Sequence, residues 1–176
     1  MLKVLVIVNG YLEENCYVIH DGKYALVIDP GSESEKIINE INNLKLKVLG
    51  ILITHYHFDH IGALEDLKNE YNITDVIDYK SKKNIKIKTF EFEIIKNYGH
   101  TMDSVSFYFK KEKIMFTGDF VFRDSIGKYD LENEYTMFES LEKFKLLPDD
   151  ITIYPGHGPS STTGYEQRYN YFIRGL

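Results

Sequence analysis

Four short apolar segments of this chain each run directly into a histidine or an aspartate. Apolar runs of this length are typical of buried strands. Side chains at strand ends sit on rigid supports and can converge in space, as a preorganised site requires. The segments are Ile51–Thr54, Ile94–Gly99, Ile114–Gly118 and Ile151–Gly156, and the residues that follow them are His55, His100, Asp119 and His157. We therefore expect the four residues that follow these strands to meet in one polar site.

The densest part of this pattern is the segment Thr54–His60, which reads Thr-His-Tyr-His-Phe-Asp-His. His55 and His57 alternate on an extended segment and so point to the same side, while Asp59 and His60 are expected to begin a helix. A lone histidine is more often a surface or core residue than a ligand. Here, however, five of the six histidines of the chain belong to the pattern. We therefore predict a metal centre.

The number of candidate ligands indicates more than one metal ion. They are His55, His57, Asp59, His60, His100, Asp119 and His157. Seven ligands are too many for one tetrahedral zinc ion, and they divide naturally between two divalent ions that share a carboxylate. Neutral imidazoles and carboxylates favour zinc, with iron or manganese as alternatives.

The rest of the chain alternates between strand and helix patterns. Strands are predicted at Lys3–Val8, Asn15–His20, Tyr24–Asp29, Val48–Ile53, within Ile85–Ile95, and at Val105–Phe109, Ile114–Phe116 and Ile151–Tyr154. Helices are predicted at Ile37–Leu44, Ile61–Tyr71, Phe138–Leu147 and Tyr165–Ile173, the first of them opened by a capping box of Ser32 and Glu35. This mixture favours an α/β or α+β layer fold, in a single domain of residues 1–176.

The composition of the chain argues against some classes of binding partner. A formal net charge of -6 argues against nucleic acid, and the lysines between Lys80 and Lys88 fit an amphipathic strand. No apolar run reaches the roughly 18 residues that a membrane span needs. Cys16, the single cysteine, cannot form an internal disulfide and fits a buried strand position in a reducing compartment. We expect a cytoplasmic protein that acts on a small molecule. The sequence does not determine its oligomeric state.

The order of the candidate ligands resembles the motifs of the metallo-β-lactamase superfamily. The run H-x-H-x-D-H at His55–His60 is followed by His100, Asp119 and His157, and the resemblance extends from Val27–Gly31 to the end of the chain. It implies an αββα sandwich of two half-repeats. It also implies a first metal at His55, His57 and His100, a second at Asp59, His60 and His157, and Asp119 as the bridge.

Within that superfamily the chain is similar to the glyoxalase II-like branch. The similar stretches are Gly99–Thr101, Thr117–Phe122, Ser125–Asp130, Pro155–Pro159, and Thr162 and Thr163 with Glu166 and Asn170. Lys128 stands where that branch usually has arginine, and Tyr171 replaces its usual proline. We also expect the helical domain that supplies much of the glutathione site in glyoxalase II to be missing. The chemistry is thus better supported than the substrate.

The resemblance implies a hydrolase that cleaves a thioester such as S-lactoylglutathione with a hydroxide shared by two metal ions. Asp59 and Asp119 are the candidate catalytic residues. Asp29 is a candidate for fixing a ligand histidine from behind, or else a turn aspartate that bonds nearby backbone. The candidate substrate contacts are Lys128, Tyr129, Arg123 and Arg168.

Three alternatives remain open at this point. One is an oxidoreductase similar to persulfide dioxygenases, with a single iron at His55, His100 and Asp119. A second is a lactonase or another ester hydrolase on the same scaffold. The third is a non-catalytic metal-binding module, which a site open to water disfavours because structural zinc sites close their coordination.

Overall fold

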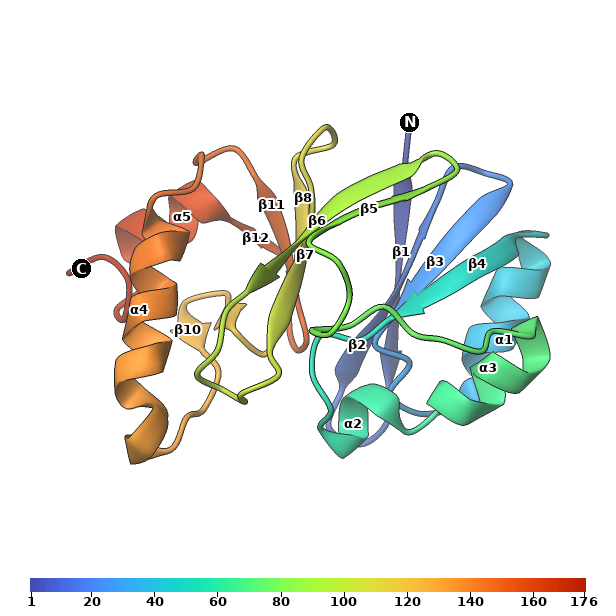
Figure 1. Ribbon diagram of the computed structural model, residues 1–176, viewed down its shortest axis with the longest axis horizontal. Coiled ribbons are helices and arrows are strands. Elements are labelled where there is room, and N and C mark those ends of the chain that lie inside the picture. The colour runs from blue at the N-terminus through green and yellow to red at the C-terminus, as the bar shows by residue number, and fades with distance from the viewer.

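Two large sheets stack face to face in the computed structural model, which describes residues 1–176 (Figure 1). The first sheet contains β1 (Lys3–Asn9), β2 (Glu14–His20), β3 (Tyr24–Ile28) and β4 (Lys47–Leu52), in that order. β3 and β4 run parallel, and the other neighbours run antiparallel. Helices α1 (Ser34–Asn43) and α3 (Leu64–Tyr71) cover the outer face, and the short helix α2 (Phe58–Ile61) precedes α3.

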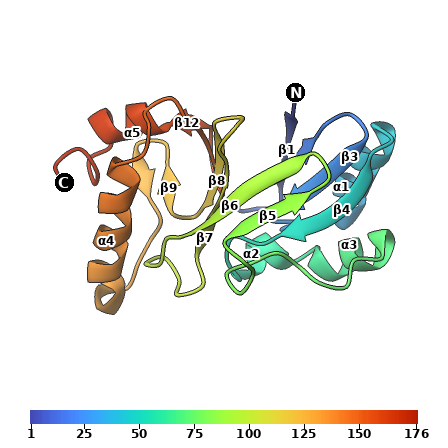
Figure 2. The ribbon, with the colours of Figure 1, turned by 45° about the horizontal axis from the view of Figure 1, so that its top comes forward.

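The second sheet has the order β12-β11-β8-β7-β6-β5, in which only β11 and β8 run parallel (Figure 2). Its strands are β5 (Asn84–Ile87), β6 (Phe90–Lys96), β7 (Val105–Phe109), β8 (Ile114–Gly118), β11 (Thr152–Pro155) and β12 (Ser161–Thr162). A separate hairpin of β9 (Val121–Phe122) and β10 (Ser125–Ile126) follows β8. The 3-10 turn η1 (Leu131–Asn133) leads into α4 (Glu134–Lys145), and α5 (Thr163–Tyr169) lies near the C-terminus; α4 and α5 flank this sheet.

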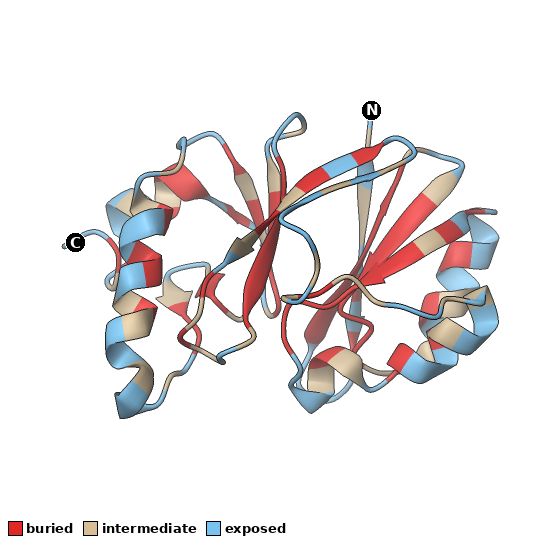
Figure 3. Ribbon diagram, in the orientation of Figure 1, coloured by how far each residue is buried: buried red, intermediate tan, exposed pale blue.

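Three apolar layers hold the sandwich together. Every residue of β2 is buried (Figure 3), because Cys16 and Val18 face α1 and α3 while Tyr17 and Ile19 face the second sheet. The phenylalanines of β7, with Phe116, fill the space between the sheets. Met137, Leu141 and Phe144 of α4 pack on the far side of the second sheet. This is the αββα sandwich that the superfamily resemblance implied, and it confirms the predicted layer fold of sheets and helices.

Two local predictions were wrong, one about the start of α1 and one about the helix predicted after His60. Ser32 does not cap α1, since its hydroxyl donates to Glu14 Oε1 at 2.8 Å, and the helix begins after Glu33 with no side-chain cap. The helix predicted over Ile61–Tyr71 is interrupted at Gly62. A Cβ at Gly62 would lie 2.2 Å from the carbonyl oxygen of Gly31, so the lack of a side chain there lets the β3–α1 loop pass close by.

The last helix also differs from its predicted bounds. It begins earlier, where Thr162 accepts a hydrogen bond from Tyr165 N at 3.2 Å as an N-cap. It ends before Asn170, whose side-chain amide donates to Ser125 O at 2.9 Å. No helix of the structure is long and apolar enough to cross a membrane.

Candidate metal centre

The predicted ligands all lie at or beyond strand ends on one edge of the sandwich. His55 follows β4, and His57 is the extended residue at which α2 begins, so that Asp59 and His60 lie on that helix. Asp119 directly follows β8 and His157 follows β11; because these strands are parallel, their carboxyl ends meet at the same edge. His100 comes from the loop between β6 and β7.

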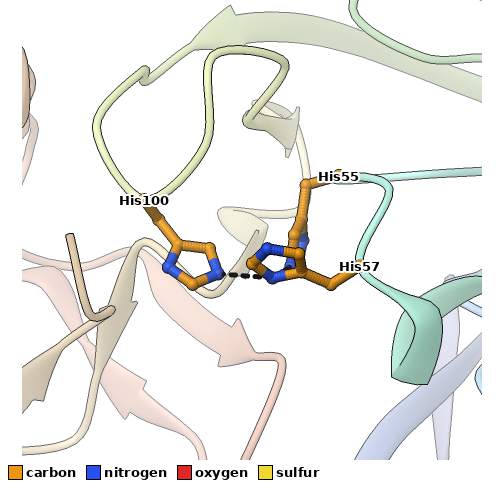
Figure 4. Close-up of side chains that lie close together, drawn as sticks. All are labelled: His55, His57 and His100. Atoms are coloured by element: carbon orange, nitrogen blue, oxygen red, sulfur yellow. Dashed lines mark hydrogen bonds between the residues drawn. The ribbon is translucent and has the colours of Figure 1, made fainter. Parts of the chain in front are cut away.

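Three histidines form the first group of potential ligands. His57 Nδ1 lies 3.1 Å from His55 Nε2 and 2.9 Å from His100 Nε2. Figure 4 shows the three rings pointing toward one another from two separate segments of the chain. Their donor atoms all lie within 4.8 Å of one another, close enough to hold a metal ion.

Asp59, His60 and His157 form the second group, which meets the same 4.8 Å limit. His157 Nε2 lies 3.3 Å from Asp59 Oδ2, and His60 Nε2 lies 3.9 Å from the same oxygen. His60 is fully buried, whereas the Asp59 side chain is 13% exposed. The second group therefore has a closed side and a side that solvent can reach.

The Asp119 carboxylate stands between the two groups. Its Oδ1 lies 3.3 Å from His60 Nε2, and its Oδ2 lies 3.6 Å from His100 Nε2 and 3.7 Å from His157 Nε2. Gly156 makes room for it, because a Cβ there would lie 2.1 Å from Asp119 Oδ1. The carboxylate thus contacts both groups from one position.

Two buried atoms at this point have no hydrogen-bond partner, namely His60 Nε2 and Asp119 Oδ1. They face each other at 3.3 Å without hydrogen-bond alignment. Unpartnered buried polar atoms are rare in folded proteins. A cation between them would satisfy both, so these residues fit a metal ion.

The charge states of the free site favour metal binding at most positions. Burial lowers the pKa of His55 to about 2 and also lowers the pKa of His57. Burial alone would raise the pKa of Asp119, but His60 and its neighbours lower it to about 2. Neutral imidazoles and an ionised carboxylate are the forms that bind metals.

His60 is the exception. Burial alone would lower its pKa, but the carboxylates of Asp119 and Asp29 raise it to about 10. In the metal-free chain both ring nitrogens of His60 are therefore protonated at neutral pH. A metal ion that binds Nε2 must displace the proton on that nitrogen.

Four of the histidines make a polar contact through Nδ1, on the side of the ring that faces away from the centre. His60 Nδ1 lies 3.0 Å from Asp29 Oδ2, and His55 Nδ1 lies 3.1 Å from Thr54 Oγ1. Backbone carbonyls accept from the other two, Lys128 O from His100 Nδ1 and Leu12 O, at 3.0 Å, from His157 Nδ1. These contacts leave Nε2 free to face the centre, the usual arrangement for ligand histidines.

Asp29 connects two of these supports. Besides its contact with His60, its carboxylate accepts from Thr54 N at 2.7 Å and from Thr54 Oγ1 at 2.6 Å. These partners lie 25 residues away in the sequence, so Asp29 does not bond nearby backbone as a turn aspartate would. Sequence reasoning missed Thr54, although its position directly before the H-x-H run pointed to it. It also missed the carbonyls of Leu12 and Lys128, because a carbonyl leaves no trace in a sequence.

The four candidate substrate contacts are placed differently. Lys128 is exposed beside His100 and makes no side-chain hydrogen bond or ion pair. Tyr129 packs edge-on against Phe138, with ring centroids 6.1 Å apart. The Arg123 guanidinium lies 4.6 Å from the Tyr165 ring centroid.

Arg168 is not brought to the centre. Its guanidinium binds Asp149 Oδ2 at 2.7 Å. Asp149 precedes β11, whereas His157 follows that strand, so Arg168 lies toward the opposite end of β11 from the centre.

An apolar groove of about 330 Å³ adjoins the second group. It lies between the β1–β2 turn and α2, and Asp59 is part of its lining. The exposed side chains of Tyr11, Leu12 and Phe58 form its apolar walls.

Comparisons with known proteins show the family to which the chain belongs. The sequence matches the Metallo-beta-lactamase superfamily over residues 10–86 and 82–157. A Haemophilus influenzae protein named hydroxyacylglutathione hydrolase GloC is 33% identical over 92% of this chain and 93% of its own. The crystal structure of BLEG-1 B3 metallo-beta-lactamase has a TM-score of 0.91 at 30% identity, covering 97% of this chain and 99% of that one. TTHA1623 in a di-iron-bound form has a TM-score of 0.86 at 29% identity, covering 96% and 100%. This chain therefore belongs to the metallo-β-lactamase superfamily, a superfamily of metallo-hydrolases.

Proposed function

We propose that this protein is a dinuclear metal-dependent hydrolase that cleaves thioesters of the S-lactoylglutathione type. The observation that carries the proposal is the position of Asp119, which contacts both groups of potential ligands at 3.3 to 3.7 Å. A single-metal site has no need of the second group. The relative named hydroxyacylglutathione hydrolase supports the thioester as substrate.

One ion would be held by His55, His57 and His100, and the other by Asp59, His60 and His157, with Asp119 shared. Zinc suits this set of imidazoles and carboxylates, and the di-iron form of TTHA1623 supports iron as the alternative. Two bound divalent ions would supply a water of lowered pKa and an electrophile for the substrate carbonyl.

The side chains have separate tasks in this proposal. The Asp59 side chain is 13% exposed, and it would orient the attacking water by accepting a hydrogen bond from it. Asp29 holds the ring of His60 and thus acts as a positioning residue. A thiolate leaving group needs little protonation, which fits a site with no evident general acid.

The surroundings suggest how the substrate binds. The apolar groove beside Asp59 is open to the acyl part of the substrate. Lys128 is exposed beside His100 with no partner, so its ammonium group is free to bind a carboxylate of a glutathione-like thiol. Arg123 and Tyr129, on the same segment, are secondary candidates.

A substrate panel tests this proposal. It contains S-lactoylglutathione, other acyl-glutathiones, simple thioesters, lactones and a chromogenic β-lactam, all measured with the zinc-loaded protein. We expect thioesters to be the fastest class. Faster turnover of lactones or of the β-lactam than of every thioester would refute thioesterase activity and leave only the metallo-hydrolase.

Elemental analysis of protein made in metal-balanced medium tests the dinuclear centre. We expect close to two zinc ions per chain. One iron per chain with negligible zinc would overturn the dinuclear hydrolase and favour the mononuclear oxidoreductase.

A variant of Lys128 tests substrate binding. In the substrate panel, Lys128→Ala is expected to raise the KM for acyl-glutathiones about 2- to 5-fold, the scale of one exposed ion pair. Arg168→Ala is the matched control and should leave KM unchanged.

A further inference from the structure

A buried carboxylate outside the metal centre connects three segments of the chain. Glu166 of α5 is fully buried, and it accepts hydrogen bonds through both of its oxygens. Its Oε2 accepts from Asp124 N at 3.0 Å and from Asn170 Nδ2 at 2.8 Å, and its Oε1 accepts from the hydroxyl of Ser161. No lysine, arginine or histidine pairs with it.

Asn170 makes a second hydrogen bond to the β9–β10 hairpin. Its Nδ2 also donates to Ser125 O at 2.9 Å, and its side chain is fully buried. Asp124 lies in the turn of the hairpin with a φ of 63°, and Ser125 is the first residue of β10. Glu166 therefore fixes the amide of a turn residue, and Asn170 fixes the carbonyl of the first residue of β10.

The hairpin in turn connects two parts of the metal centre. β9 begins two residues after Asp119, and after β10 the backbone amide of Gly127 donates to Phe120 O at 3.1 Å. The next residue is Lys128, whose carbonyl oxygen accepts the hydrogen bond from His100 Nδ1. The segment 119–128 thus begins at one potential ligand and ends at the group that orients another.

We infer that Glu166, together with Asn170, is a positioning residue for the metal centre: the pair holds the β9–β10 hairpin so that Lys128 O fixes the ring of His100. This inference rests on the proposed metal centre. The plain alternative is that Glu166 and Asn170 only stabilise the docking of α5. That docking has its own contact, since Gln167 Nε2 of the same helix donates to Leu147 O, after α4, at 2.8 Å.

Four variants separate the two roles. Glu166→Leu and Asn170→Ala remove the contacts to the hairpin. Glu166→Gln is the conservative variant, because an amide oxygen can still accept from Asp124 N and Asn170 Nδ2 while its NH2 group donates to the Ser161 hydroxyl. Gln167→Ala, the matched control, removes a contact of α5 that does not involve the hairpin.

The first measurement is the tautomer of His100 in the metal-free protein, read from its imidazole 15N shifts. The second is the zinc dissociation constant, measured by competition with a chelator. We expect Glu166→Leu and Asn170→Ala to lose the single Nδ1–H tautomer and to weaken zinc binding about 10-fold, at the low end for residues behind a ligand. Glu166→Gln and Gln167→Ala should keep the wild-type values, whatever their melting temperatures.

Unchanged tautomer and zinc affinity in Asn170→Ala and Glu166→Leu, with only a lower melting temperature, would overturn the inference. Equal changes in Gln167→Ala would overturn it as well. If Glu166→Leu does not fold, Asn170→Ala decides alone. If the wild-type protein binds no zinc, the metal-centre proposal fails, while the tautomer of the metal-free protein still decides whether the hairpin positions His100.

Discussion

The orientation of each imidazole determines what the centre can bind. A histidine offers a lone pair on one ring nitrogen only when the other carries the proton. Carbonyl oxygens of Leu12 and Lys128 can only accept, so His157 and His100 must carry their protons on Nδ1. The candidate ligand nitrogens of these two histidines are therefore set by contacts outside the centre. Asp29 and Asp119 lie on opposite sides of the ring of His60.

The two aspartates should respond differently to truncation. Asp119→Ala removes the only carboxylate that contacts both groups, so metal content and hydrolysis should be lost together. Asp29→Ala should retain more metal and lose about 10- to 100-fold in affinity or activity. It should also destabilise the fold by about 1–3 kcal/mol, because the buried Thr54 N loses its acceptor.

Elemental analysis after dialysis, together with activity assays, checks both variants. Asp75→Ala, on an exposed loop residue, is the control and should behave as wild type. Full metal content and turnover in Asp119→Ala would show that the ligand assignment is wrong.

At the scale of the elements, two hairpins from different sheets meet far from the metal centre. Asp21 lies in the β2–β3 turn, and its carboxylate accepts from Lys23 N at 2.9 Å and Tyr24 N at 2.7 Å. It also accepts from the hydroxyl of Thr89 in the β5–β6 turn at 2.6 Å. The Thr89 hydroxyl first, and then the backbone amides, lower the pKa of Asp21 to about 2.

This contact predicts a pH-dependent contribution to stability. Because folding lowers the pKa of Asp21 from 3.8 to about 2, the contribution is present above pH 4 and is lost as the pH falls toward 2. Thr89→Val should raise the pKa of Asp21 and should lower the free energy of unfolding at neutral pH. We expect less than about 1 kcal/mol, because an exposed carboxylate is screened by water. The difference from wild type should shrink on acidification.

Carboxyl 13C titration by NMR, with unfolding curves at pH 7 and pH 3, checks this prediction. Thr74→Val is the control, because the exposed Thr74 hydroxyl donates a hydrogen bond to its neighbour Asp75 and not to Asp21. An unchanged pKa of Asp21 in Thr89→Val would contradict the assigned cause.

At the scale of the whole molecule, the candidate ligands come from both halves of the sandwich. The segment after β4 and helix α2 supply four of them, and the second half supplies His100, Asp119 and His157. The apolar layer between the sheets holds the halves together, for example through Tyr17 and Phe116, whose ring centroids are 5.1 Å apart. Metal ions that bind both halves bind only the folded chain.

Removal of the metal should therefore lower the stability of the whole protein. A ligand that binds only the folded state stabilises it by about 2.7 kcal/mol when its free concentration is 100 times its Kd. We expect a higher melting temperature with zinc than with a chelator, measured by calorimetry. Asp119→Ala should lose most of this difference. Equal melting temperatures of wild type in both conditions would contradict ligation across the two halves.

The sequence by itself determined the layers and the candidate ligands. Strand and helix patterns depend on near neighbours in the chain, so the continuous apolar run in β2 and the helical spacing in α4 were sufficient for prediction. The H-x-H-x-D-H run and the residues after the other strands were also visible, because ligation requires particular side-chain types.

Tertiary structure alone decided the contacts that orient those ligands. Ser32 donates to Glu14 rather than capping α1, and just after α2 the amide of Ala63 donates to Pro30 O of another loop. His157 is oriented by the carbonyl of Leu12, 145 residues away in the sequence. A local pattern cannot report such partners, because every residue has a carbonyl and only the packing of the two sheets determines which one faces a given imidazole.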